Sequence, residues 1–401
     1  MLQVEEALQA ILEDIRALPP ESVHLADSLG RTLAEDYFAQ TDLPPFDNSS
    51  MDGYAVVAAE CATASAKSPV SAVVIGESAA GSATTIQPSA FTAIRIFTGA
   101  PIPPGYTAVI PQENVTVATD RSAIVIQTQV SEGAYIRRKA SDVAAGTLIA
   151  PKGAVITPFL LLALAAHGNA MIQVTRKPAV AIIATGSELV EPGQPLQFGQ
   201  IYNSNAYMLA AMAQSAGAEA TILPIAQDNE EDILRRLEEA QRYDLIISSG
   251  GVSVGDHDLI KSAIEKMGQL KLWRVNMKPG KPVAFGKIGA TPIIGLPGNP
   301  VSSAVTCLLF AAPAIHKMLG CSEASQEIFS AHITETIAQS DRRSYIRCAL
   351  THIDGEAHVT PLGLQDSHRT MSIAFMDVLA IIPEGSGVFP TGTLVQVIRA
   401  R

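Results

Sequence analysis

Residues 179–186 read AVAIIATG, residues 245–251 read LIISSGG, and residues 291–298 read TPIIGLPG. Each stretch is a continuous apolar run that ends in a glycine turn. Patterns typical of helices of about 10–15 residues lie between them. Apolar strands that alternate with helices indicate a largely parallel sheet covered on both faces. These stretches therefore predict an α/β core whose strands end along one edge.

The rest of the 401-residue chain is organised around this core. Residues 3–17 have apolar side chains on one helix face, and a second periodic stretch lies near residues 26–37. Residues 45–140 alternate short apolar runs with Gly, Pro and Ser, which predicts a β-rich domain. Residues 157–167 predict a short buried helix. From about residue 325 strand patterns return without helices, so we expect a small β-barrel or sheet.

Charge and composition exclude several classes of protein. Lys and Arg total 28 against 39 Asp and Glu, a net charge of −11, which argues against nucleic-acid binding. Residues 153–175 and 288–316 carry no charge, but glycine and proline interrupt them, so we interpret both as buried segments and expect no membrane span. The acidic N-terminus does not resemble a signal peptide. The four widely spaced cysteines predict reduced thiols, no structural zinc and a cytoplasmic protein.

The three glycine turns predict a binding site for an anion. In open α/β sheets, ligands bind outside the carboxyl ends of the strands. Glycine lets the backbone approach a ligand closely, and a helix N-terminus offers unpaired amides. The alternative is that Gly and Pro only end the strands, and no P-loop motif is present. The candidate binding residues of the turns are Thr185, Gly186, Ser248, Gly250, Gly251, Gly255, Pro297, Gly298, Asn299 and Pro300.

Charged residues lie near the same turns. Lys278 and Lys281 flank a Pro-Gly turn and could hold a phosphate or an oxyanion, or could simply be solvated. Carboxylates without paired Cys or His suit a hard cation such as magnesium. Each carboxylate also has a structural interpretation. Asp228 with Glu231 fits a capping box, Asp256 fits a helix N-cap, and Asp52 fits a turn.

Six motifs occur in an order and spacing that resemble one family. They are PPFDNSSMDGYA (44–55), IFTGAPIPPG (96–105), ATGSELV (184–190), IISSGGVSVGDHD (246–258), MKPGKPVAFG (277–286) and GLPGNPVSS (295–303). Nearly the whole chain resembles the MoeA family of molybdopterin molybdenumtransferases, to which the C-terminal part of gephyrin also belongs.

The resemblance implies a multidomain α/β plus β fold. A central domain similar to molybdopterin adenylyltransferase, with a mostly parallel sheet, would be accompanied by an inserted β-rich domain and a C-terminal β-barrel. The implied domains are an α/β substrate-binding core (1–25 plus 176–325), an elongated linking domain (26–44 plus 138–175), a β-rich domain (45–137) and a barrel (326–401).

The resemblance also implies an activity. Molybdate would be inserted at the dithiolene sulfurs of adenylylated molybdopterin, with magnesium, and AMP would be released. The implied assembly is a homodimer in which Asp52 of one subunit completes the site of the other. A molybdopterin adenylyltransferase and molybdoenzyme chaperones are expected as further partners. Two alternatives stay open: adenylyl transfer to molybdopterin, and a gephyrin-like scaffold without catalysis.

Residue roles carried over from the family complete the prediction. Its catalytic positions fall on Asp52, Asp142, Glu188, Asp228, Asp258, Lys278 and Lys281. We expect Asp228 and Asp258 to hold the metal or position water, with Glu188 in support. The family's anion-binding positions outside the turns fall on Ser302, Arg347 and Ser367.

The chain departs from the family at three places. Lys139-Ala140-Ser141 stands where a glycine, often with a glutamate, is usual, and Ser187 stands where an acidic residue is frequent. Met376-Asp377 replaces a common Ala-Asn pair. The first two departures reduce the negative charge of the predicted metal site, and the third would affect packing in the barrel.

Overall fold

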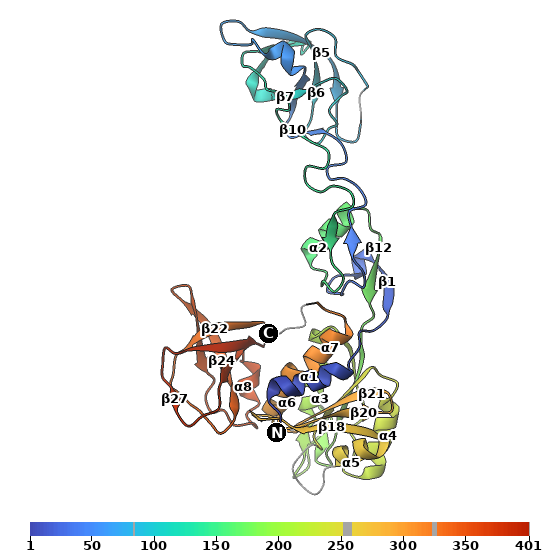
Figure 1. The fold of residues 1–401 in the computed structure, drawn as a ribbon, viewed down its shortest axis with the longest axis vertical. Helices are drawn as coiled ribbons and strands as arrows, with labels where there is room; N and C mark the ends of the chain where they lie inside the picture. The colour runs from blue at the N-terminus through green and yellow to red at the C-terminus, as the bar shows by residue number, and fades with distance from the viewer. Residues whose placement is uncertain (83–84, 252–258, 323–326, 401) are drawn as a thin grey trace. The chain divides into compact units, whose positions relative to one another are not determined.

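The computed structural model of the chain describes residues 1–82, 85–251, 259–322 and 327–400. Their contacts divide the chain into two compact units, whose ribbons are drawn in Figure 1. The first unit contains Met1–Glu35, Lys152–Leu161 and Met171–Arg401, and the second contains Asp36–Pro151 and Leu162–Ala170. The finer division into four domains stays a prediction.

A six-stranded sheet forms the centre of the first unit. Its first four strands are parallel and its last two are antiparallel. This arrangement confirms the predicted α/β core with a mostly parallel sheet. In spatial order the strands are β16 (Glu219–Ile222), β13 (Ala179–Ala184), β17 (Leu245–Ser249), β21 (Thr291–Leu296), β20 (Pro282–Ile288) and β18 (Gly268–Arg274).

Helices cover both faces of this sheet because alternate strand residues point to opposite sides. Val180 and Ile182 belong to the core on one face, whereas Ala181 and Ile183 belong to the core on the other. The first face is packed by α1 (Val4–Asp14), α3 (Ser204–Ser215), α6 (Pro300–Thr306) and α7 (Ala312–Met318), and the second by α4 (Glu230–Ala240) and α5 (Leu259–Met267).

The N-terminal helix packs in the α/β core, as the resemblance implied. Val4, Ala7 and Ile11 are buried in the same core as β13. At the end of α1, Asp14 forms ion pairs with Lys271 (2.5 Å) and Lys287 (3.1 Å). The hydrogen bond from Lys271, reinforced by Lys287, lowers the pKa of the Asp14 carboxyl. The side chain of Trp273, on the neighbouring strand β18, lies outside the described residues.

One helix in the described part of the chain is long and apolar enough to cross a membrane by length and composition. It runs from Pro300 to Met318 through α6, the π-helical turn η4 (Cys307–Ala311) and α7. Within its most apolar window, 78% is buried inside the fold. It is therefore a core helix of the first unit, in agreement with the predicted buried segment.

The second unit contains the β-rich domain predicted for residues 45–140. Its six-stranded sheet is mainly antiparallel, with one parallel pair between β5 and β6. In spatial order the strands are β7 (Ala108–Pro111), β4 (Gly53–Val56), β6 (Thr92–Ile96), β5 (Val70–Ser78), β9 (Ala123–Ile126) and β8 (Val115–Val117).

A closed barrel forms the C-terminal part of the first unit. Five strands pair in order, and the last pairs with the first, so the sheet has no free edge within the ring. The strands are β24 (Arg343–Ile353), β25 (Glu356–Pro361), β22 (Ile328–Ile333), β28 (Leu394–Arg399) and β26 (Val378–Ile382). The predicted barrel is confirmed, although one helical turn, α8 (Met371–Ala374), interrupts its strands.

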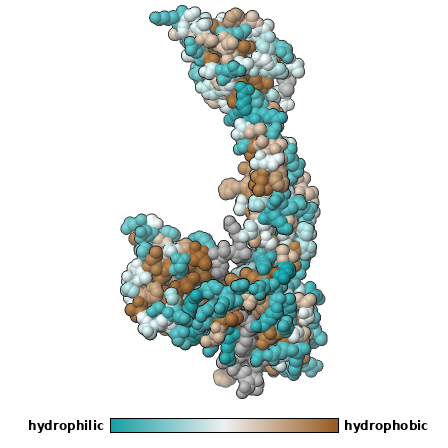
Figure 2. All heavy atoms as spheres, in the orientation of Figure 1, coloured by the Kyte–Doolittle hydropathy of each residue, from teal (hydrophilic) through white to brown (hydrophobic). Residues whose placement is uncertain are grey.

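Two local predictions are wrong. The periodic stretch at 26–37 forms no helix beyond the 3₁₀ turn η1 (Leu25–Asp27), because Thr32 and Leu33 enter bridges to Val155 and Val174 and Tyr37 begins the strand β2 (Tyr37–Phe38). Residues Pro158–Ala166 do form the helix α2, but it is not buried: Leu164 alone is fully covered. Phe159 is 84% exposed and Leu162 is 68% exposed. Figure 2 shows hydrophobic residues at the surface of this segment.

Ala140 occupies a backbone conformation that favours glycine. Its φ is +61°, in the left-handed region, within a loop where Asp42 and Asp47 accept hydrogen bonds from neighbouring backbone amides. Ala140 belongs to the segment before Asp142 in which the resembling family usually carries a glycine. A side chain in this conformation costs about 1–2 kcal/mol, which exceeds the roughly 0.5–1 kcal/mol of extra chain entropy that glycine loses on folding.

We therefore predict that Ala140→Gly raises the free energy of unfolding of the second unit by up to about 1 kcal/mol. Urea denaturation followed by circular dichroism measures it. Ala10→Gly in the middle of α1 is the matched control and should destabilise by about 1 kcal/mol. Equal destabilisation by both substitutions would contradict the proposed strain.

Candidate active site

A cleft of about 1290 Å³ lies at the carboxyl ends of the parallel strands, within the first unit. The three glycine turns that follow β13, β17 and β21 form its floor, as the sequence predicted. It is larger than the roughly 300–1,000 Å³ typical of a site for one small ligand. The predicted residues that line it are Thr185, Gly186, Glu188, Asp228, Gly250, Gly251, Pro297, Gly298, Asn299 and Pro300.

The three turns pack closely against one another. The Gly250 amide donates to the carbonyl oxygen of Leu296, and the Thr185 amide donates to that of Ser249. Gly250 has φ +90°, and a Cβ there would lie 2.9 Å from the carbonyl oxygen of Thr185. A Cβ on Gly298 would in turn lie 3.6 Å from the Cα of Gly250. Glycine is required at 250 both by the backbone angle and by this close approach.

An asparagine that sequence analysis missed joins two of these turns. Asn205, on the first turn of α3, donates from Nδ2 to Ser249 Oγ (3.0 Å) and to the Gly298 carbonyl oxygen (2.7 Å). The preceding Asn203 is buried, and its Oδ1 has no hydrogen-bond partner among the described atoms. The run NSN that opens a helix after a short strand was the available signal, because such residues favour helix starts.

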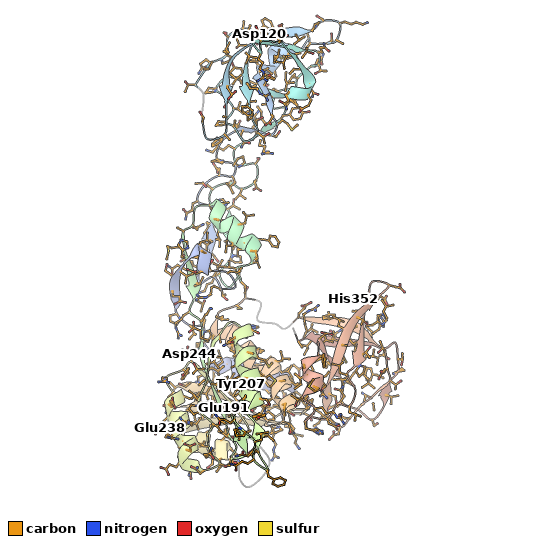
Figure 3. All side chains as sticks on the ribbon, turned by 180° about the vertical axis from the view of Figure 1, so that it is seen from behind. Asp120, Glu191, Tyr207, Glu238, Asp244 and His352 are labelled. Atoms are coloured by element: carbon orange, nitrogen blue, oxygen red, sulfur yellow. The ribbon has the colours of Figure 1, made fainter. Side chains whose placement is uncertain are left out.

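The wall beside α3 carries an aromatic side chain. Tyr202 lines the cleft, and its hydroxyl donates to the carbonyl oxygen of Gln194 (3.1 Å), which fixes the ring at its far end. Nearby, Glu191 accepts from Tyr207 Oη (3.0 Å) and from Asn203 Nδ2 (3.1 Å). Figure 3 labels Glu191 and Tyr207 on this side of the unit. The wall combines a fixed aromatic face with polar groups.

The barrel supplies a further wall. His368 and Thr370, from the loop between β25 and α8, line the cleft. Ser367 in the same loop accepts from Asn299 Nδ2 (3.0 Å) at its hydroxyl and from the Val301 amide (3.2 Å) at its carbonyl. The loop therefore already uses one amide at the start of α6, so fewer amides are free for an anion there than the sequence suggested.

Two carboxylates face the cleft, and neither is used as a helix cap. The N-cap of α4 is Asn229, whose Oδ1 accepts from the Asp232 amide, so the capping box expected for Asp228 is wrong. Asp228 instead accepts at Oδ2 from the Ser187 amide (3.0 Å), across to the turn after β13. The Glu188 carboxylate lies against Gly186, close enough to clash with a Cβ there.

The cleft offers oxygen donors to a metal. Glu188 and Asp228 provide carboxylates, and Thr185 Oγ1 is buried without a partner among the described atoms. No group of three His, Cys, Asp or Glu side chains suited to a metal occurs in the described part of the chain. Magnesium commonly binds through one or two carboxylates, with water and substrate phosphates as the other ligands. The donor set fits magnesium on that basis.

Several predicted residues do not line the cleft. Ser248, Ser302 and Arg347 are buried. Ser367 accepts a hydrogen bond from Asn299, which does line the cleft. Lys278 and Lys281 are not part of its lining, whereas Pro282, which follows them in the sequence, is. Gly255, Asp256 and Asp258 lie outside the described residues. The roles carried over for these positions stay predictions.

Asp52 and Asp142 belong to the second unit. Asp52 accepts at Oδ1 from the Thr98 amide (2.8 Å) and hydroxyl (2.9 Å). The bond from the Thr98 amide, with that from the hydroxyl, lowers the pKa of the Asp52 carboxyl. Thr98 lies in the motif IFTGAPIPPG, and sequence analysis did not single it out. Both carboxylates are exposed in the chain.

Known families match almost the whole chain. Residues 2–168 match the MoeA N-terminal region (domain I and II), residues 181–317 match a family described as a probable molybdopterin binding domain, and residues 334–399 match the MoeA C-terminal region (domain IV). The six-stranded sheet of the second unit falls within the first matched region. Most of the cleft lining falls within the second, and four of the five barrel strands, with His368 and Thr370 of the cleft, fall within the third.

Relatives that match over their full length belong to the same family as the matched models. The chain is 37% identical to molybdopterin molybdenumtransferase 2 of Mycobacterium tuberculosis, with 99% of each chain covered. It is 35% identical to molybdopterin molybdenumtransferase of Haemophilus influenzae, covering 99% of this chain and 98% of the relative. A crystal structure of the molybdopterin biosynthesis MoeA protein from Pyrococcus horikoshii OT3 is 29% identical, with TM-score 0.86 and complete coverage of both chains.

A parallel sheet with a polar cleft at its carboxyl edge, a barrel wall and a separate β-rich unit define a multidomain α/β enzyme. The Pyrococcus horikoshii structure shares this architecture over its whole length. The chain belongs to the MoeA family of molybdopterin molybdenumtransferases. It is accordingly a transferase of molybdenum cofactor biosynthesis.

We predict that Asn205→Ala lowers the free energy of unfolding of the first unit by about 1–3 kcal/mol, because Ser249 Oγ and the Gly298 carbonyl both lose their donor. Urea denaturation measures the change. Asn114→Ala, at an exposed position in the second unit, is the control and should change stability by less than about 0.5 kcal/mol. Similar values for the two variants would show that Asn205 does not hold the turns together.

Proposed function

We propose that this chain inserts molybdate into adenylylated molybdopterin at the dithiolene sulfurs and releases AMP, and that the cleft over the three turns is the active site. The observation that carries the proposal is the cleft itself. Its floor is three glycine turns in mutual contact, and its volume suits a substrate that combines a pterin with a nucleotide. Relatives named for this transfer of molybdenum support the choice of substrate.

The chain's own residues would bind and orient the substrate. Gly250 and Gly298 let the turns approach its phosphates without steric hindrance, and Thr185 offers a hydroxyl that has no partner in the described structure. The ring of Tyr202 presents a fixed face for an aromatic group. Lys278 and Lys281, on the turn before β20, would attract both anionic substrates as point charges.

The carboxylates of the cleft need a cation if they are to share it with phosphates. Glu188 and Asp228 would hold magnesium, with Asp258 as the further ligand expected from the motif. When bound, magnesium neutralises phosphate charge and polarises the bond that breaks. The amide of Ser187 orients Asp228 for this role through its 3.0 Å hydrogen bond.

We further propose a cytoplasmic homodimer in which each active site combines both subunits. Asp52 is exposed and fixed by Thr98, so it is available to a partner's site, and the exposed Phe159 and Leu162 of α2 are apolar surface that a second copy would cover. Four free cysteines, three of them buried, suit a reducing compartment. A molybdopterin adenylyltransferase would supply the substrate, and molybdoenzyme chaperones would receive the product.

The reaction is tested by incubating the purified chain with adenylylated molybdopterin, molybdate and magnesium, and by following AMP and molybdenum cofactor together. We expect both products in equal amounts. Asp228→Asn should slow their formation by about 10²-fold or more, because it removes a charge next to the reacting phosphates. Glu238→Gln, an exposed acid on α4 that Figure 3 labels, is the control and should leave the rate unchanged.

Chelation of divalent cations should stop the wild-type reaction, and added magnesium should restore it. If AMP formed without molybdenum cofactor, the proposed reaction would be contradicted. If Asp228→Asn had the same rate as Glu238→Gln, the proposed role of Asp228 would be contradicted. Pyrophosphate formed from ATP and unmodified molybdopterin would instead support adenylyl transfer.

Shared active sites predict complementation between two inactive variants. Asp52→Asn and Asp228→Asn should each be inactive alone, since each removes one carboxylate from every site. When the two variants are co-expressed and pair at random, half of the dimers contain one subunit of each variant. One of the two sites in such a dimer contains both natural carboxylates. We therefore expect about a quarter of the wild-type rate from the mixture. If a mixture that is shown to contain mixed dimers recovers no activity, Asp52 and Asp228 of the same subunit form one site, and the shared site is contradicted.

A further inference from the structure

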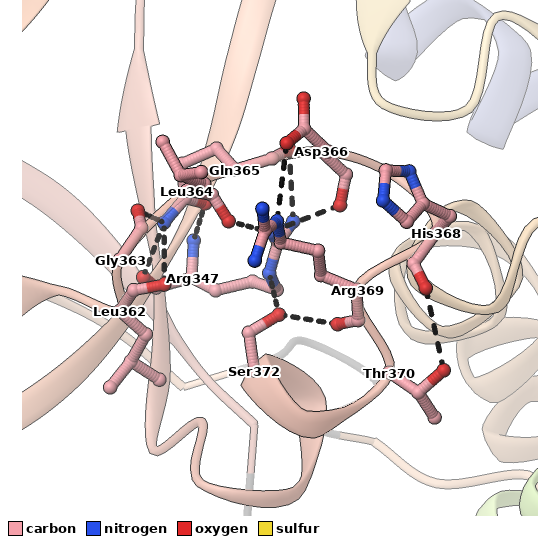
Figure 4. Close-up of polar contacts among 10 residues, drawn as sticks. All are labelled: Arg347, Leu362, Gly363, Leu364, Gln365, Asp366, His368, Arg369, Thr370 and Ser372. Carbon is pink, nitrogen blue, oxygen red and sulfur yellow. Dashed lines mark hydrogen bonds and ion pairs between the residues drawn. The ribbon is translucent and has the colours of Figure 1, made fainter.

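A buried arginine in the barrel is held mainly by backbone carbonyl groups. Arg347 lies on β24, is fully buried, and forms no ion pair with any residue that the structure describes. Its Nε donates to Ser372 Oγ (2.7 Å). Its terminal nitrogens donate to three consecutive carbonyl oxygens, those of Leu364 (3.2 Å), Gln365 (3.4 Å) and Asp366 (3.3 Å), as Figure 4 shows.

Burial of such a charge is unfavourable unless hydrogen bonds replace its water. Burial lowers the pKa of the Arg347 guanidinium, yet an arginine stays protonated in proteins. The charge is therefore retained and is compensated by backbone dipoles, one hydroxyl and the attraction of the Asp366 carboxylate in the same segment. The backbone of Arg347 is also bound, since its amide donates to Gln365 Oε1 (3.0 Å) and its carbonyl accepts from Gln365 Nε2 (3.2 Å).

The segment held in this way, residues 362–372, is the barrel's wall of the cleft. Its other side reaches the start of α6, where Ser367 bonds Asn299 and the Val301 amide. His368 and Thr370, which follow directly, line the cleft. The same eleven residues thus connect a buried cation on one side with the ligand site on the other.

We propose that Arg347 is a positioning residue, whose guanidinium fixes residues 362–372 so that Ser367, His368 and Thr370 meet the ligand site. This deepens the proposed function and rests on it. The proposal differs from the anion-binding role that the resemblance implied for Arg347, because every contact of the guanidinium recorded in the described structure goes to this segment. A planar fork of donors is needed to reach four acceptors, and a lysine ammonium cannot replace it.

The test combines local hydrogen exchange with binding of AMP as the probe, on the full chain. In Arg347→Lys we expect the amides of Arg369, Thr370 and Ile373 to exchange about 10-fold faster or more, and the Kd for AMP to rise about 10-fold. Ser372→Ala removes one contact and should give smaller changes in the same direction. Arg399→Lys, a surface arginine of the barrel paired with Glu327, is the control and should change neither.

The outcomes separate this role from others. Faster exchange of the segment with unchanged AMP affinity would overturn the proposal, because the segment would then not serve the site. Weaker binding with unchanged exchange would also overturn it and would mean that Arg347 contacts the ligand. If Arg347→Lys does not fold, Ser372→Ala decides by the same two measurements. Failure of wild-type turnover would contradict the proposed reaction, and exchange and AMP binding would still test Arg347.

Discussion

The register of three parallel strands determines where this protein can bind a ligand. Ala184 of β13 is paired with Ser249 of β17, which is paired with Leu296 of β21. Three turns therefore begin at one level and on one edge of the sheet, where the backbone must leave the strands. Glycine at these turns lets them pack together, and Asn205 joins two of them from α3. The cleft is a consequence of this alignment.

The charge of the cleft sets the chemistry that it can support. Among the described residues that line it, the charged groups are Glu188 and Asp228, with His368 as a titratable neighbour. Such a lining repels phosphates unless a cation is bound with them. The magnesium ion that we propose, together with Lys278 and Lys281 on the turn before β20, would resolve this conflict. Anionic substrates would then be compatible with an acidic chain and an acidic site.

Sequence patterns were sufficient where structure depends on local periodicity. The apolar runs with glycine turns predicted the parallel sheet and eight residues of the cleft, and the apolar face of residues 3–17 predicted the helix α1. Patterns failed where tertiary contacts decide. Composition alone suggested that α2 is buried, yet Phe159 is exposed. A capping box was equally compatible with Asp228, and only the structure places Asn229 at the cap.

The residues of the cleft that the sequence did not reveal were missed for one physical reason. Asn205, His368 and Thr370 reach the cleft from segments far from the glycine turns in sequence, so no local spacing marks them. Arg347 illustrates the opposite case: the family resemblance pointed to the residue, but its burial and its carbonyl partners favour a different role, the one that we propose. Sequence motifs identify participating positions, whereas burial and hydrogen bonding decide what each can do.

The most direct measurement is a crystal structure of the chain with AMP bound. This account predicts that the AMP phosphate lies over the turns after β13, β17 and β21, within hydrogen-bond distance of groups on Thr185, Ser249 or Gly250. It also predicts that the nucleotide is bordered by residues 367–370 of the barrel. AMP bound elsewhere on the first unit, with the three turns unoccupied, would contradict the claim that their alignment creates the active site.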